Sequence, residues 1–120
     1  MKALEYDVEV TIGSTFELFL ALVSPSGFID LIDYKARSQM REDYTSTDAF
    51  LSFTTDNSSM ILGGTKGTIK MFASDVKTAA IRADSGVWDL ELVSPTGRVY
   101  QIMYGKVIIH PEATRIDNEV

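Results

Sequence analysis

Three pairs of carboxylates lie close together in the sequence: Asp30 and Asp33, Glu42 and Asp43, and Asp89 and Glu91. Paired carboxylates can act as general acid and general base, or bind a cation. Asp89 and Glu91, however, alternate with apolar residues at positions 88, 90 and 92, so both carboxylates face solvent on one side of a predicted strand. The pair at Asp30 lies beside a turn and is typical of a surface loop. None of the pairs predicts a catalytic site.

Nucleophilic and metal chemistry also lacks its usual residues. The chain has no cysteine and a single histidine, His110, which precedes Pro111 and is expected at the exposed end of a strand. Without further histidines, no serine has the partners of a catalytic triad. The segment from Gly63 to Gly67 lacks the spacing of a phosphate-binding loop, and no long helix follows it, so it predicts a hairpin loop. We therefore expect no enzyme activity, no cofactor and no metal site.

The overall charge argues against nucleic-acid binding. The 120 residues include 17 acidic and 11 basic side chains, a formal net charge of −6, which opposes a phosphate backbone. Acidic residues at positions 5 and 7 stand where a secretory signal would have its apolar segment, and no stretch approaches the ~20 apolar residues of a membrane span. We expect synthesis in the cytoplasm, no export route and no membrane insertion.

One aromatic residue stands apart as a candidate contact residue. Most of the phenylalanines, and Trp88, lie in alternating apolar runs, where core packing explains them. Tyr44 instead lies in the polar stretch 42–48, which has no periodicity and predicts an exposed loop.

A repeated segment indicates how the predicted strands are connected. Residues 20–27 (LALVSPSG) recur as residues 90–97 (LELVSPTG), with six identities. Proline followed by glycine after an alternating run is typical of a hairpin turn. An internal duplication and two independent uses of a favourable turn both explain the match, and the second is the simpler. Either way, the pattern predicts two long hairpins stacked face to face as a β-sandwich.

The apolar periodicity predicts an all-β domain over residues 8–113, with residues 1–7 as an N-terminal extension and residues 114–120 as a tail or assembly arm. The strand over 15–23 is apolar on both faces and is expected to be central. Residues 34–41 predict a strand with a basic outer face, and Trp88 is predicted to point inward. Gly105, within the last strand, indicates a bulge or bend. Residues 74–81 form the one plausible helical turn, with Ser74 as its N-cap.

Several segments together resemble a family of small proteins of tailed phages and prophages. They are GSTF at 13–16, ARSQMR at 36–41, WDLEL at 88–92, GKV at 105–107 and PEATR at 111–115. Their order and spacing match the family's pattern, which reads YDLELTDxDG, a strand, and GxVxVxPEVTR near its C-terminus. Departures include Trp88 in place of Tyr, a Ser-Pro-Thr-Gly corner in place of an acidic turn, Gln101 in place of Arg and Ala113 in place of Val.

The resemblance implies an immunoglobulin-like antiparallel β-sandwich with at most one short helix, and a non-enzymatic virion protein. Such proteins form rings or collars at the tail tip or baseplate and attach fibres. This implies a homo-oligomer, other tail or fibre proteins as partners, and location in the virion tail. Arg115 and Ile116, past the last strand, are candidate assembly residues together with Tyr44. The alternative is a ligand-binding β-sandwich module that recognises a carbohydrate or host surface.

Overall fold

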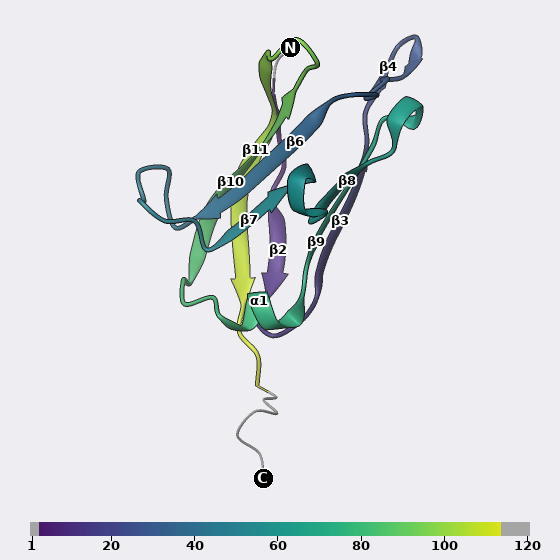
Figure 1. Cartoon of the computed structure of the whole chain (residues 1–120). Helices are drawn as coiled ribbons and strands as arrows, with labels where there is room; N and C mark the ends of the chain where they lie inside the picture. The colour runs from purple at the N-terminus through teal and green to yellow at the C-terminus, as the bar shows by residue number, and fades with distance from the viewer. Residues whose placement is uncertain (1–2, 114–120) are drawn as a thin grey trace.

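The computed structural model describes residues 3–113 as two β-sheets packed face to face (Figure 1). The larger sheet contains β1 (Leu4–Glu5), β2 (Val8–Thr11), β6 (Lys35–Arg41), β7 (Leu51–Thr54), β10 (Ser85–Val93) and β11 (Val99–His110). The smaller sheet contains β3 (Phe16–Ala21), β8 (Met60–Leu62) and β9 (Thr68–Ala73). The remaining elements are the β4 (Val23–Ser24) and β5 (Gly27–Phe28) hairpin, the 3-10 turns η1 (Thr55–Asn57) and η2 (Gly64–Lys66), and α1 (Asp75–Ala79). The predicted all-β sandwich with one short helix is confirmed.

The larger sheet is built around β10, which pairs antiparallel with β6 on one side and β11 on the other. Its residues alternate between buried and partly exposed, as a strand with one covered face must. Trp88, Leu90 and Leu92 are its buried apolar side chains, so the inward orientation predicted for Trp88 is confirmed. Trp88 is 1% exposed, and its indole Nε1 donates to the Tyr6 carbonyl oxygen at 2.7 Å.

The N-terminal segment closes the larger sheet by pairing parallel with β11. Leu4 lies opposite Met103, and Val8 lies opposite Val107, so the register is the same on both sides of a short interruption. There the Asp7 carboxylate accepts a hydrogen bond from the Lys106 N–H at 2.9 Å. The boundary at residue 8 is therefore corrected: residues 4 and 5 belong to the sheet and not to an extension.

The predicted bulge at Gly105 is also corrected. The register shift lies between Leu90 and Glu91 of β10, opposite Ile102, and not at Gly105. A Cβ at position 105 would collide with the carbonyl group of Tyr6. Glycine is required there because Tyr6 and Asp7, between the two paired segments, lie closely against β11.

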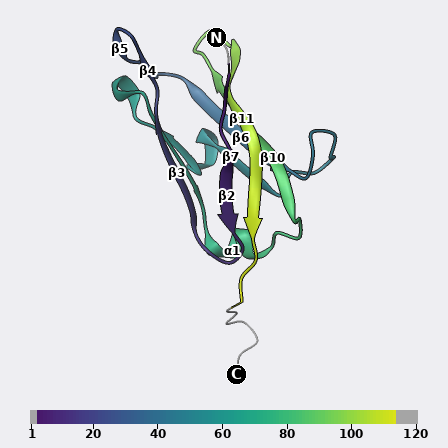
Figure 2. The ribbon, with the colours of Figure 1, turned by 180° about the vertical axis from the view of Figure 1, so that it is seen from behind.

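The smaller sheet has the strand order β3-β9-β8, which makes β3 an edge strand and not the central strand that its sequence predicts. Figures 1 and 2, which show the molecule from opposite sides, both place β3 at the outer border of the sandwich. Its outward residue Phe19 is 67% exposed, while the inward Leu18 and Leu20 are half-buried. The sequence pattern predicts that both faces of β3 are buried, but its outer face is exposed and its inner face is only half-buried.

Both repeated corners form hairpin turns, but only the second connects long strands. Residues 94–97 join β10 to β11, whereas residues 24–27 join the two-residue strands β4 and β5. The hydroxyls of Ser24 and Ser26, and those of Ser94 and Thr96, lie 3.0 Å apart. The stacking of two long hairpins is corrected, because β3 pairs with β9 and β6 joins the opposite sheet.

The core lies between the sheets and is closed at one end by α1. Phe16 of β3 and Phe53 of β7 meet across the sandwich with ring centroids 5.7 Å apart. The predicted helical turn is confirmed, with Ser74 as N-cap. Its buried Thr78 accepts a hydrogen bond from the Gly13 N–H at 3.1 Å and donates to the Ser14 carbonyl at 2.8 Å. This hydroxyl therefore ties the helix to the turn between β2 and β3.

Candidate functional site

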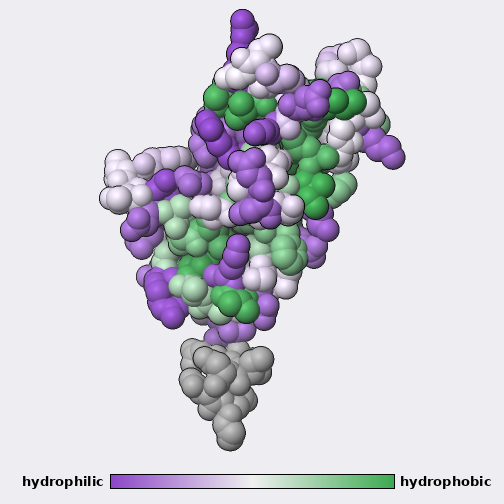
Figure 3. All heavy atoms as spheres, viewed as in Figure 1, coloured by the Kyte–Doolittle hydropathy of each residue, from purple (hydrophilic) through white to green (hydrophobic). Residues whose placement is uncertain are grey.

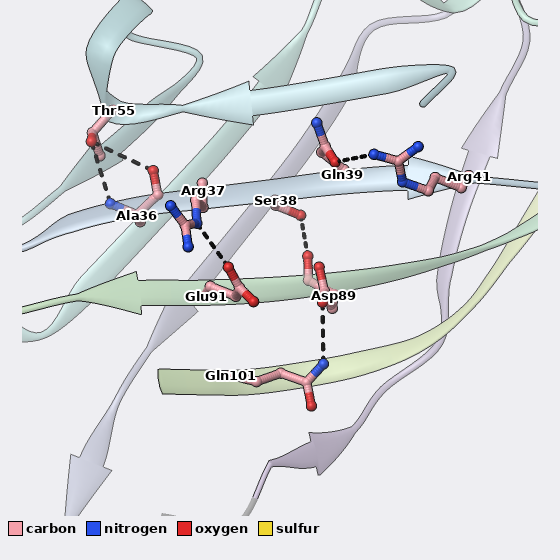
Figure 4. A network of polar contacts seen from close by, with 9 residues as sticks. All are labelled: Ala36, Arg37, Ser38, Gln39, Arg41, Thr55, Asp89, Glu91 and Gln101. Carbon is pink, nitrogen blue, oxygen red and sulfur yellow. Dashed lines mark hydrogen bonds and ion pairs between the residues drawn. The ribbon is translucent and has the colours of Figure 1, made fainter. Parts of the chain in front are cut away.

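A groove of about 490 Å³ lies on the outer face of the larger sheet. We call it the outer groove, and its polar lining comprises Arg37, Gln39 and Arg41 of β6, Asp89 and Glu91 of β10, and Tyr44 of the β6–β7 loop. Figure 4 shows the β6 and β10 members of this set.

The strand pattern explains why these side chains share one face. Residues 36, 38 and 40 of β6 are buried, so the alternating residues 35, 37 and 39 point outward. The antiparallel register places Arg37 opposite Glu91 and Gln39 opposite Asp89. The sequence predicted the basic face of β6 and the solvated carboxylates of β10 separately. It gave no signal that the two strands are neighbours.

The polar side chains of the outer groove form hydrogen bonds and ion pairs with one another and with Gln101 of β11. The Arg37 Nε lies 2.7 Å from Glu91 Oε1, and Gln101 Nε2 donates to Asp89 Oδ2 at 3.1 Å. Arg41 Nη2 donates to the side-chain oxygen of Gln39 at 2.6 Å (Figure 4). Each charged side chain of the outer groove is therefore hydrogen-bonded to a neighbouring side chain.

The loop that carries Tyr44 is folded back by its own polar groups. Arg41 Nη1 donates to the carbonyl oxygens of Ser46 and Thr47 at 2.9 and 2.8 Å. The Asp43 carboxylate accepts from the hydroxyl and the N–H of Thr45 at 2.6 and 2.8 Å, and these hydrogen bonds lower the pKa of Asp43. The turn is thereby stabilised from both ends.

Tyr44, the contact residue predicted from the sequence, lines the outer groove. It is 62% exposed. Partial burial of its hydroxyl and the nearby negative charge of Asp89 raise the pKa of Tyr44, so the phenol stays protonated and can donate a hydrogen bond. An exposed phenol beside planar guanidinium, amide and carboxylate groups suits binding of a polar ligand or surface.

The other residues that the sequence singled out do not line the outer groove. Asp30 accepts a hydrogen bond from the Ile32 N–H at 2.9 Å, which is a turn contact. His110 Nε2 lies 2.7 Å from Glu9 Oε1 at the surface. Within residues 3–113, no group of three His, Asp or Glu side chains is placed to hold a metal ion. Arg115 and Ile116 lie outside the described residues.

A second surface was not predicted as a candidate. Phe19 of β3, Ile61 of β8 and Phe72 of β9 lie on the outward face of the smaller sheet and are 67, 56 and 42% exposed. We call this the apolar outer face. On the side of the molecule seen in Figure 3, apolar atoms are interspersed with hydrophilic ones. On the apolar outer face, Lys70 Nζ lies 3.7 Å from Glu17 Oε2. The apolar character of both faces of residues 15–23 was the available signal, but it was interpreted as burial.

Comparisons with known proteins bear on the fold. No family model matches the sequence, and no curated protein matches it. A crystal structure of a chicken T-cell receptor matches with a TM-score of 0.55 and 11% identity, over 93% of this chain and 56% of the receptor chain. The chain thus spans about half the length of that receptor chain. With the two packed sheets, this likeness defines an immunoglobulin-like β-sandwich, as predicted. No helix among the described residues is long and apolar enough to cross a membrane.

Proposed function

We propose that this protein is a non-enzymatic structural component of a phage virion, located in a ring or collar at the tail tip or baseplate. There it would contact other copies of itself and hold fibres or other tail proteins. The sequence resemblance supports the phage assignment. The apolar outer face supports a role in assembly.

The apolar outer face is the observation that carries this proposal. Apolar side chains that gather on the exposed face of a soluble domain are typical of surfaces that bind other proteins. Here Phe19, Ile61 and Phe72 come from all three strands of one sheet, so the patch has a rigid support. A rigid support limits the conformational entropy lost when a partner binds.

The test is the protein content of purified phage particles. Particles from a strain that carries the gene are purified by density gradient and analysed by mass spectrometry, and the protein is located by immunogold labelling. We expect the protein in intact particles, with label at the tail end distal to the head. Particles that lack the protein, or label confined to the cytoplasm of infected cells, would refute the proposal.

The outer groove favours a second candidate function, the recognition of a carbohydrate on a host surface. Its tyrosine, guanidinium, amide and carboxylate groups can stack on a sugar ring and hydrogen-bond its hydroxyls. A glycan array with the purified protein tests this function, with Tyr44→Ala as the test variant. Phe28→Ala, which removes an aromatic side chain of similar exposure on β5, outside the groove lining, is the control. Binding that survives Tyr44→Ala but not Phe28→Ala would contradict a role for the groove.

A further inference from the structure

Within residues 3–113, the edge of β3 presents backbone groups without a hydrogen-bond partner at three positions. The Leu22 N–H donates to the Gly67 carbonyl at 2.8 Å, so the pair 22 and 67 is hydrogen-bonded. In antiparallel strands, bonded and non-bonded pairs alternate, so Glu17, Phe19 and Ala21 lie in non-bonded pairs with β9. The Phe72 N–H, opposite Glu17, accordingly bonds to Ser59 on the far side of β9 at 2.9 Å. The N–H and C=O groups of residues 17, 19 and 21 therefore point to the open edge.

Natural sheets usually protect such an edge, and β3 carries little protection. The common devices are proline, lysine, a bulge or a very short strand. β3 has six residues, pairs with β9 in unbroken register, and contains neither proline nor lysine. The other edge strands of the two sheets are shorter, with two residues in β1, four in β2, three in β8 and four in β7.

The sequence of β3 is that of a strand covered on both faces. Phe19 is exposed on the outer face, and Leu18 and Leu20 remain half-buried on the inner face. A further strand along this edge would bring apolar neighbours beside all three side chains. It would make β3 a central strand, which is what its composition predicts.

We propose that the missing strand is β3 of a second copy, paired antiparallel about a two-fold axis beside Phe19. Antiparallel pairing of identical strands is self-complementary, because each copy offers the same donors and acceptors. The smaller sheets of the two copies then form one continuous sheet. The inference deepens the proposed function, since it names a surface for self-association. A two-fold contact yields a closed dimer, and a ring would need a further contact.

Charge selects the register. A register centred on Glu17 would place two carboxylates opposite each other, which is destabilising. In the register centred on Phe19, the two Phe19 rings are opposite, and Glu17 lies opposite Ala21 of the second copy. Lys70 brings no unbalanced charge to the contact, because it is paired with Glu17 of its own chain at 3.7 Å.

Cross-linking tests the contact directly, because the chain has no cysteine of its own. Residues opposite each other in a hydrogen-bonded antiparallel pair have Cα atoms about 5.5 Å apart, within the reach of a short thiol-specific cross-linker. Phe19→Cys should therefore form a covalent dimer. Phe28→Cys, at 63% exposure a close match to Phe19, should not. Glu17→Cys mixed with Ala21→Cys should cross-link, and Glu17→Cys alone should not.

Sedimentation equilibrium tests the energetics. Phe19→Lys places like charges opposite each other, and Ala21→Pro removes an edge-facing donor without removing a bond to β9. Each should weaken dimerisation by at least about tenfold, while Phe28→Lys leaves it unchanged. Circular dichroism of each variant confirms that the monomer remains folded.

Three results would overturn the inference. One is a wild-type chain that stays monomeric at the highest accessible concentration, which would leave this edge to a strand of another protein. Another is an oligomer that persists unchanged in both Phe19→Lys and Ala21→Pro. The third is cross-linking of Phe28→Cys as efficient as that of Phe19→Cys. None of these results depends on finding the protein in particles, so the failure of this contact and the failure of the virion proposal are distinguishable.

Discussion

Substitution of Trp88 by alanine is the most direct test of the sandwich core. The side chain is 1% exposed, its strand partners are Met40 on β6 and Gly105 on β11, and its Nε1 donates to the Tyr6 carbonyl at 2.7 Å. Alanine therefore removes the largest core side chain and also a contact that holds the N-terminal segment against the sheet.

The expected loss is a large part of the folding free energy. Replacing a buried tryptophan with alanine costs about 3–5 kcal/mol, and the lost hydrogen bond adds roughly 1 kcal/mol. A single domain has about 5–15 kcal/mol of stability in total. Trp88→Ala should therefore be partly or wholly unfolded at 25 °C if the wild-type stability lies at the lower end of that range. Trp88→Phe keeps an aromatic ring but not the hydrogen bond, and should cost less.

Urea unfolding followed by far-ultraviolet circular dichroism measures the difference, since the only tryptophan is lost in the variants and fluorescence cannot serve. We expect the order wild type, Trp88→Phe, Trp88→Ala in decreasing free energy of unfolding. A value for Trp88→Ala within about 1 kcal/mol of wild type, well below the usual cost, would refute the inward packing. Equal values for the two variants would show that the ring contributes nothing beyond the hydrogen bond.

Three further substitutions and titrations probe other parts of the molecule. Gly105→Ala should destabilise the domain by about 1–3 kcal/mol in urea unfolding, because its Cβ meets a backbone carbonyl of the N-terminal segment. An unchanged stability would mean that this segment does not lie against β11 at Gly105. Thr78→Val should cost about 1–3 kcal/mol in the same assay, because the buried hydroxyl satisfies two backbone groups. The raised pKa of Tyr44 means that its neutral form is favoured in the folded state. Its contribution to stability is therefore fully present below pH ~10 and is lost as the pH rises further, and absorbance titration should show a late-ionising component that disappears in Tyr44→Phe.

For most strands, the face that is buried could be predicted, because buried and exposed residues alternate within a few positions. The pattern around Val8 and Val10, and that of Trp88 and Leu90, is decided locally by which side chains are apolar. The N-cap at Ser74 is equally local. For such features, the sequence neighbours contain the physical information that is needed.

The pairing of strands could not be predicted in the same way. Alternation gives the face of a strand but not its neighbour, so β3 was expected to be central and the segment before residue 8 was expected to lie outside the sheet. The same limit applies to the outer groove. Tyr44 was identified by its polar surroundings, but the meeting of Arg37 with Glu91 depends on a contact between residues 54 positions apart.

The parallel closure of the larger sheet has a consequence for folding during synthesis. β2 begins at Val8, but its partner residues lie at 107–110 of β11. The strand therefore cannot pair until residues 107–110 have left the ribosome, and Val8 and Val10 stay without their final cover until then. Contacts this distant in sequence carry a high loop-closure cost and slow the folding transition. Synthesis of the last strand, rather than formation of the first hairpin, should therefore set the time at which the protein becomes native.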